Sequence, residues 1–171
     1  MTTNSGSVLI LCYGNPGRLD DGLGAAFAEK VKDKALSGVT VEVDYLLTVE
    51  HASDVAENSV VIFVDASLTS PAPFSFRRVE PLKIQSFSTH IIEPGSILGL
   101  AEELFGAETP GYCLGIRGYE FDAFGEHLSP QAEKNLTAAL DFSLQLLATG
   151  EFEAAADNGD FWGMKCRMEN T

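Results

Sequence analysis

The segment "SVLILCYGNPGRLDDGLGAAFAEKVKDKAL" (7–36) contains the pattern that sets the architecture. Residues 7–14 are a short apolar run that ends in glycine, which is typical of a strand buried on both faces. In 20–36 apolar side chains then recur at four-residue spacing, beginning at Leu23 and ending at Ala35. This spacing predicts a helix with one apolar stripe. A buried strand followed by an amphipathic helix is the repeating unit of a parallel α/β domain.

The rest of the chain continues this alternation of strands and helices. Prolines bracket one strand, 71–81, and favour a place for it at a sheet edge, where a missing backbone N–H is tolerated. Ser129 followed by Pro130 predicts the beginning of the last helix. The predicted strands are 39–47, 60–67, 71–81 and 112–121, and the predicted helices are 48–59, 95–106 and 128–148. We therefore expect an α/β fold, a three-layer sandwich with a mostly parallel twisted sheet of about five strands flanked by helices.

Residues 1–149 are predicted to form a single α/β domain, because no linker or internal repeat interrupts the pattern. From Gly150 onward the sequence lacks sustained periodicity and is rich in small and charged residues. We expect 150–171 to be a C-terminal tail that is disordered in part.

The composition is that of a soluble globular protein, with 45% hydrophobic and 21% charged residues. The formal net charge of -14 disfavours nucleic acid and anionic lipid as partners, because an acidic surface repels both. The three cysteines form no CxxC pair, and the sequence has neither a basic signal region nor an apolar segment long enough to span a bilayer. We expect a cytoplasmic protein that binds neither nucleic acid nor a membrane, with a monomer as the simplest state.

The glycine-rich loop 13–24 lies where open α/β sheets bind ligands, beyond the carboxyl end of a strand. Its glycine spacing matches neither common phosphate-binding motif, and Asp20 and Asp21 would repel an anion at the beginning of the helix. One carboxylate can cap that helix by accepting free backbone N–H groups, and we expect Asp20 to do so. Asp21 is then available to a ligand.

Two further loops at the same edge add candidate residues. Asp65 ends an apolar strand, and an aspartate there can simply bond to loop amides. His90 lies in the loop 88–96, and a lone histidine is most often a surface residue. Together with Asp21, however, they could form an open three-ligand site for a borderline divalent ion such as nickel or zinc. The candidate catalytic and metal-binding residues are therefore Asp21, Asp65 and His90.

Other catalytic signatures are missing from the sequence. There is no G-x-S-x-G nucleophile elbow and no H-E-x-x-H helix, so a serine hydrolase and a zincin lack their motifs. Glu50 and His51 begin a short helix, where an acidic side chain is comfortable without any function. His127 precedes a helix cap and is expected to be exposed.

Four blocks of the sequence resemble, in order and at matching spacing, the endopeptidases that mature nickel-iron hydrogenases. The blocks are "GNPGRLDDGLG" (14–24), "VVIFVDAS" (60–67), "STHIIEPGSILGLAEELFG" (88–106) and "IRGYEFDAFGEHLSPQAEKNL" (116–136). The resemblance extends over about residues 7–148. Position 21 is Asp here and Glu in some members of that family.

The resemblance implies a proteolytic step late in hydrogenase assembly. It implies that the partner is the precursor of the hydrogenase large subunit, which loses a short C-terminal extension after nickel has entered its active site. It implies further that the nickel of the substrate is recognised and that no metal or cofactor is bound permanently. The metal-contacting positions of the family correspond to Asp21, Asp65 and His90, and one carboxylate could also act as general base toward water.

Three other functions remain open at this point. A flavodoxin-like electron carrier suits an acidic α/β chain, although the first loop lacks the Ser and Thr residues that a flavin phosphate needs. A non-catalytic chaperone would bind the same precursor without cutting it. A small-molecule hydrolase would use the same three side chains to hold zinc.

Overall fold

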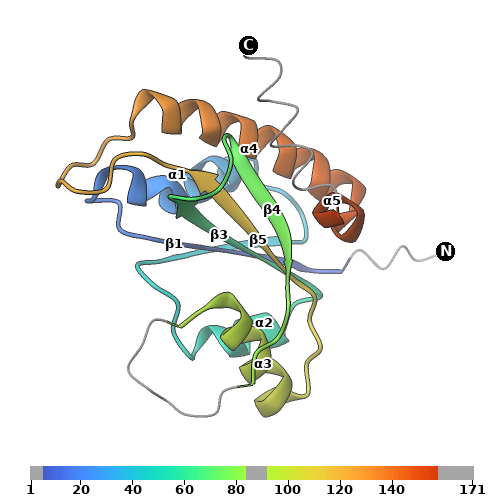
Figure 1. The fold of residues 1–171 in the computed structure, drawn as a ribbon. Coiled ribbons are helices and arrows are strands. Elements are labelled where there is room, and N and C mark those ends of the chain that lie inside the picture. Colours follow the sequence, from blue (N-terminus) through green and yellow to red (C-terminus); the bar gives the residue numbers. More distant parts are fainter. Residues whose placement is uncertain (1–5, 84–91, 158–171) are drawn as a thin grey trace.

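The computed structural model describes residues 6–83 and 92–157 of the chain (Figure 1). The strands are β1 (Val8–Tyr13), β2 (Val39–Asp44), β3 (Val60–Ser67), β4 (Phe74–Val79) and β5 (Gly111–Arg117). The helices are α1 (Leu23–Lys32), α2 (His51–Ala56), α3 (Pro94–Phe105), α4 (Pro130–Thr149) and α5 (Phe152–Asp157), and a 3-10 turn, η1 (Leu19–Gly22), precedes α1. Within these described residues, no helix is both long and apolar enough to cross a membrane.

The five strands form one sheet in the order β2-β1-β3-β5-β4. β1 pairs in parallel with β2 and β3, and β3 pairs in parallel with β5. β4 runs antiparallel to β5 at the edge of the sheet, with Phe74 opposite Ile116. Both predictions are confirmed: the sheet is mostly parallel, and the proline-bracketed strand lies at its edge, where Pro71 and Pro73 interrupt no central ladder.

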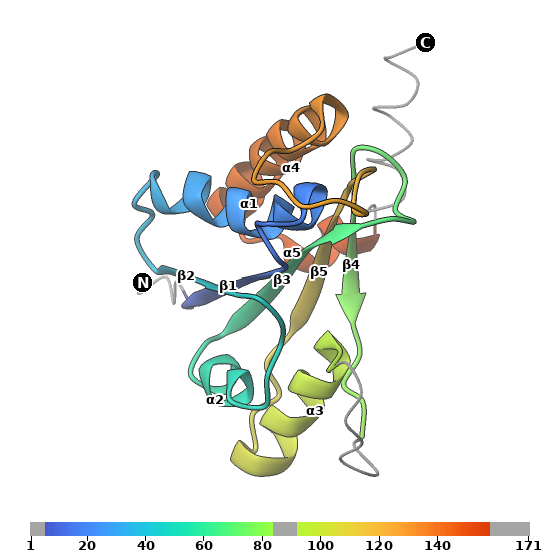
Figure 2. The same ribbon diagram turned by 90° about the vertical axis from the view of Figure 1, so that its left-hand side faces the viewer.

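Helices cover both faces of the sheet and produce three layers (Figure 1 and Figure 2). α1 and α4 pack on one face, and α2 and α3 pack on the other. Successive residues of a strand point to opposite faces. Accordingly, Ile10 of β1 belongs to the same core as Phe27 of α1, whereas Leu9 and Leu11 belong to the core beneath α2 and α3. This two-sided burial explains the uninterrupted apolar sequence of β1.

The first helix is shorter than the predicted 20–36. The chain first makes the tight turn η1, in which Leu19 has a left-handed backbone with φ 52°. The α-helix begins only at Leu23 and ends at Lys32, and Ala35, with φ 47°, follows it in a turn. The predicted apolar stripe is present, but left-handed residues at both ends of the predicted range confine the regular helix to the middle of that range.

A short helix, α5, forms part of the predicted C-terminal tail, 150–171. The ring of Phe152 stacks at 5.8 Å from that of Tyr112. The hydroxyl of Tyr112 donates a hydrogen bond of 2.7 Å to Glu153, which also pairs with Arg78 of β4. One aromatic anchor and one ion pair are too few to produce a periodic sequence signal, yet they hold this helix against the sheet.

Candidate active site

The carboxyl ends of β1, β3 and β5 meet at one edge of the sheet, which Figure 2 views from the front. Asp65 lies near the carboxyl end of β3, and Asp21 lies in η1, which follows β1. The two side chains are near enough that the negative charge of Asp21 helps to raise the pKa of Asp65. The structure therefore brings two of the three predicted site residues together, as the strand-end rule for parallel sheets indicates.

Hydrogen bonding offsets only part of the cost of burying the charged carboxyl group of Asp65. It is half-buried, and the backbone N–H of Ala66 donates a hydrogen bond of 2.8 Å to its Oδ1. Burial raises the pKa of Asp65 to about 7; the Ala66 hydrogen bond opposes this rise, and the charge of Asp21 adds to it. At neutral pH Asp65 therefore exists in both protonation states, and a cation beside it would favour the carboxylate.

The loop that carries Asp21 folds back tightly against the end of β1. The backbone N–H of Asn15 donates a hydrogen bond of 2.9 Å to Asp21 Oδ2. Gly14 has φ 133°, and a Cβ at this position would lie 2.3 Å from the backbone oxygen of Asp21. Only glycine fits both the dihedral angle and the space. The glycine at the strand end thus lets the chain bring Asp21 to the edge of the sheet.

Asp20 does not cap the helix that follows it, so the predicted capping role is wrong. Its side chain is fully buried, and its Oδ2 accepts hydrogen bonds from the backbone N–H groups of Tyr119 and Glu120 at 2.8 and 3.0 Å. Ser129 donates from its N–H to Oδ1 at 2.7 Å and from its hydroxyl to Oδ2 at 2.8 Å. Burial alone would raise the pKa of Asp20, but these hydrogen bonds together outweigh it and hold the pKa below its usual value. Because Ser129 Oγ also accepts from the N–H of Ala132, as its predicted role as N-cap requires, Asp20 fastens the site loop to the beginning of α4.

His90, the third predicted site residue, lies outside the described residues, in the segment 84–91. The chain after this segment returns near the site. Burial raises the pKa of the Tyr13 hydroxyl, and the charges of Asp65 and Glu93 both contribute to the rise. In the part of the chain that the structure describes, no group of three or more His, Cys, Asp and Glu side chains is placed to hold a metal ion.

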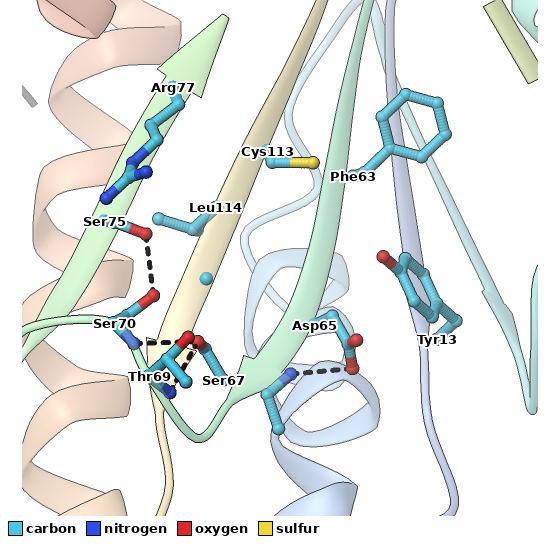
Figure 3. A pocket seen from close by; sticks show the side chains of 12 residues that line it. Tyr13, Phe63, Asp65, Ser67, Thr69, Ser70, Ser75, Arg77, Cys113 and Leu114 are labelled. Atoms are coloured by element: carbon cyan, nitrogen blue, oxygen red, sulfur yellow. Dashed lines mark hydrogen bonds between the residues drawn. The ribbon is translucent and has the colours of Figure 1, made fainter. Parts of the chain in front are cut away.

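A cavity of about 270 Å³ lies beside Asp65 on the face of the sheet that also carries α2 and α3 (Figure 3). Gly115 of β5 is in register with Asp65 of β3 on one side and with Ser75 of β4 on the other. A hollow remains between Asp65 and Ser75 because Gly115, which lies between them in the sheet, has no side chain. Figure 3 shows Asp65 and Tyr13 on one side of the cavity and the hydrogen-bonded hydroxyls of Ser70 and Ser75, 2.8 Å apart, on the other.

The cavity contains no activated nucleophile among the described side chains. Burial raises the pKa of the Cys113 thiol to about 12, and the charge of Asp65 contributes. The thiol therefore stays protonated at neutral pH and is a poor nucleophile. The hydroxyls of Ser70 and Ser75 bond to each other. Hydrolysis at this site would accordingly use water, activated by a carboxylate or by a bound cation.

Of the residues that line this cavity, sequence reasoning singles out Asp65 but not Tyr13, Ser75 or Cys113. Alternation along 71–81 could show that Ser75 and Arg77 share one face of a strand. The neighbour relation of β3, β5 and β4 that makes the row with Gly115 depends on long-range pairing, which no local pattern contains.

The other histidines that the sequence offers do not form a site. His51 is buried at the beginning of α2, where the N–H of Thr48 donates to its Nδ1 at 2.9 Å. Its Nε2 lies 3.5 Å from the carboxylate of Asp44. These contacts occupy both ring nitrogens and give His51 a structural role. His127 is exposed, as predicted.

Comparison with solved structures finds similar folds, whereas no protein-family profile and no curated protein sequence matches the chain. The nickel-iron hydrogenase maturation protease HycI from Thermococcus kodakarensis KOD1 has a TM-score of 0.63 and 20% identity, over 83% of this chain and 92% of that chain. The hydrogenase maturating endopeptidase HybD from E. coli has a TM-score of 0.63 and 20% identity, over 85% of this chain and 94% of that chain. The nickel-iron hydrogenase maturation protease HybD from Thermococcus kodakarensis has a TM-score of 0.63 and 22% identity, over 82% of this chain and 99% of that chain. At these identities the likeness is one of fold: the chain has the fold of the hydrogenase maturation proteases.

Proposed function

We propose that this chain is an endopeptidase of the hydrogenase maturation family. Its substrate is the nickel-loaded precursor of a hydrogenase large subunit, from which it removes a C-terminal extension. One observation carries the proposal: Asp21 and Asp65, which the sequence blocks match to metal-contacting positions of that family, both lie at the carboxyl edge of the sheet, near enough to interact electrostatically, in a fold that hydrogenase maturation proteases share.

The electrostatics of the two carboxylates support the binding of a cation. Asp65 carries a raised pKa because it is buried and because Asp21 is near. Holding two such groups together without a counterion is costly, and a divalent ion on the substrate would remove that cost. The third ligand in this proposal is His90, whose segment rejoins the described structure at Ile92, two residues before α3 begins.

The proposed reaction is hydrolysis of a peptide bond next to the substrate nickel. Asp21, Asp65 and His90 hold the nickel ion, which polarises the scissile carbonyl group or lowers the pKa of a bound water. One of the two carboxylates accepts the proton of the attacking water. The enzyme then needs no resident metal, because the substrate brings the ion.

The test compares nickel-loaded and nickel-free precursor as substrates, with the shortened product measured by mass spectrometry. We expect cleavage of the nickel-loaded form alone. Asp21→Asn, Asp65→Asn and His90→Ala should each lower the rate about a hundredfold or more. Asp141→Asn makes the same chemical change at an exposed position on α4 and should leave the rate unchanged.

Each alternative predicts a different result in these assays. Equal cleavage of both precursor forms would contradict recognition of nickel. Binding of the precursor without any product would identify a non-catalytic chaperone. Tight zinc at one equivalent in the isolated protein would favour a zinc hydrolase over the reaction proposed here.

A further inference from the structure

Large hydrophobic side chains are exposed mainly at the edge of the sheet that carries the candidate active site. Ten such side chains are exposed among the described residues, and seven of them lie at or just beyond the carboxyl ends of β2, β3 and β5. Among these seven, the most exposed are Phe124 at 89%, Tyr45 at 66%, and Leu46 and Leu68 at 61% each. We call this set the apolar rim: Val43, Tyr45, Leu46, Val49, Leu68, Tyr119 and Phe124.

The apolar rim is joined to the candidate site by a hollow in the surface. A cavity of about 330 Å³ is lined by Val43 and Tyr45 of the rim and by Gly14 and Pro16 of the loop that leads to Asp21. Single exposed hydrophobic residues are common on soluble proteins, but a concentration of them around a functional site indicates a binding surface. The rim comes from three separate connections of the sheet, so it surrounds the site on several sides.

The charges on the same loops define what kind of surface fits the rim. Exposed acidic side chains lie among the apolar ones in the sequence: Asp44 precedes Tyr45, Glu50 follows Val49, and Glu120 and Asp122 lie between Tyr119 and Phe124. From position 39 to position 76, which includes five of the seven rim residues, the sequence contains no lysine or arginine. Beside the other two, Arg117 lies 5.1 Å from the ring centroid of Tyr119, and Arg18 pairs through its backbone with Gly125. A complementary surface is therefore apolar at its centre and carries lysine and arginine around it.

We propose that the apolar rim is the docking surface for the folded body of the protein substrate, and that this body presents an apolar patch fringed by basic residues. The inference rests on the proposed function, because it names the part of the precursor that the same site recognises. A short extended peptide would occupy one groove, whereas this rim contacts a partner from three directions around the scissile bond. Most of the affinity then comes from contacts far from that bond.

The test places a charge in the rim and, as a matched control, at the opposite end of the molecule. Tyr45→Glu and Phe124→Glu are the rim variants. Leu104→Glu and Phe105→Glu are the controls, because these residues are exposed at the C-terminal end of α3, away from the site. All four positions are on the surface, so the variants should fold, which circular dichroism checks.

We expect each rim variant to raise KM for the nickel-loaded precursor about tenfold or more and to leave kcat within about twofold. The controls should keep the KM of the unchanged protein. The affinity for nickel-free precursor, measured by calorimetry, should fall in parallel with KM. This measurement of affinity does not depend on cleavage of the precursor.

The possible failures are distinguishable. Normal cleavage with unchanged KM and affinity in both rim variants would overturn the docking surface and leave the proposed function intact. An unchanged protein that neither cleaves nor binds the precursor would overturn both. Two further results would overturn the proposal. If the unchanged protein binds phosphatidylcholine and phosphatidylglycerol vesicles and the rim variants do not, the rim is a membrane-binding surface. If the unchanged protein dimerises in sedimentation runs and the rim variants do not, the rim binds a second copy of the chain.

Discussion

Replacing Asp65 with asparagine should make the isolated protein more stable while it abolishes the proposed cleavage. In the folded protein the carboxyl group is half-buried, with Asp21 nearby and the N–H of Ala66 donating to Oδ1. Asparagine keeps an acceptor for the Ala66 hydrogen bond and resembles the protonated acid in shape. It removes the charge that burial and Asp21 both disfavour.

The size of the effect follows from the shift in pKa. The pKa of Asp65 rises from its ordinary 3.8 to about 7, a shift of roughly three units, which corresponds to about 4 kcal/mol. Because the side chain is partly exposed, solvent screening reduces this, and we expect about 1–3 kcal/mol. Between about pH 4 and pH 7 the unfolded chain releases the proton of Asp65 while the folded chain retains it, so stability falls as pH rises through this window. The gain from Asp65→Asn is therefore small near pH 4 and complete above pH 7.

The assay is equilibrium unfolding in urea at pH 4, 6 and 8, on metal-free protein. Asp141→Asn serves as the control, because it removes an exposed carboxylate from α4 without touching the site. We expect the midpoint for Asp65→Asn to exceed that of the unchanged protein increasingly from pH 4 to pH 8. The control should follow the unchanged protein at every pH.

A variant that is no more stable than the unchanged protein at pH 8 would refute this reasoning. Asp65 would then have partners that compensate its charge. A cation bound beside it would gain no free energy from relieving the burial of that charge. A gain of equal size at pH 4 and pH 8 would also count against it, because it would show that the effect is one of packing and not of ionisation.

Two further predictions concern the frame around the site. Asp20→Asn should lower the free energy of unfolding by about 2–4 kcal/mol, because an amide nitrogen would face backbone N–H donors. Because the pKa of Asp20 is held below its usual value, the difference between the variant and the unchanged protein should become smaller below about pH 4 in the same urea experiment. Gly24→Ala should cost about 1–3 kcal/mol, because its Cβ would lie 2.5 Å from the backbone oxygen of Tyr13 and 3.2 Å from that of Val64. An unchanged melting temperature for Gly24→Ala would show that α1 does not pack as closely on the sheet as the structure has it.

The layers and most of the elements could be predicted from the sequence, because the two-sided burial of β1 and β3 produces continuous apolar runs. Elements whose ends depend on tertiary contacts could not. The first helix is predicted from 20, but Leu19 adopts a left-handed backbone and the regular helix begins at Leu23. Helix α5 is held by Phe152 and Glu153, whose partners lie on strands far earlier in the chain.

The meeting of Asp21 and Asp65 could be predicted for a similar reason. The carboxyl ends of neighbouring parallel strands share one edge, so two strand-end residues approach each other once β1 and β3 are adjacent. The cavity beside them could not, because it depends on the registers that place Gly115 between Asp65 and Ser75. The role of Asp20 was predicted wrongly because its partner Ser129 lies 109 residues further along the chain.

Asp20 and Asp21 are neighbours in the sequence with the same side chain, and their surroundings give them opposite uses. Asp20 is fully buried and accepts four hydrogen bonds, so its charge is compensated and adding a cation would gain little. Asp21 accepts a hydrogen bond from Asn15 and lies near Asp65, which itself accepts one from Ala66. Free energy of binding is available where compensation is incomplete, which is at Asp21 and Asp65. The fully bonded Asp20 holds this loop in place, so that the two incompletely compensated carboxylates stay together, as the proposed binding of a cation on the substrate requires.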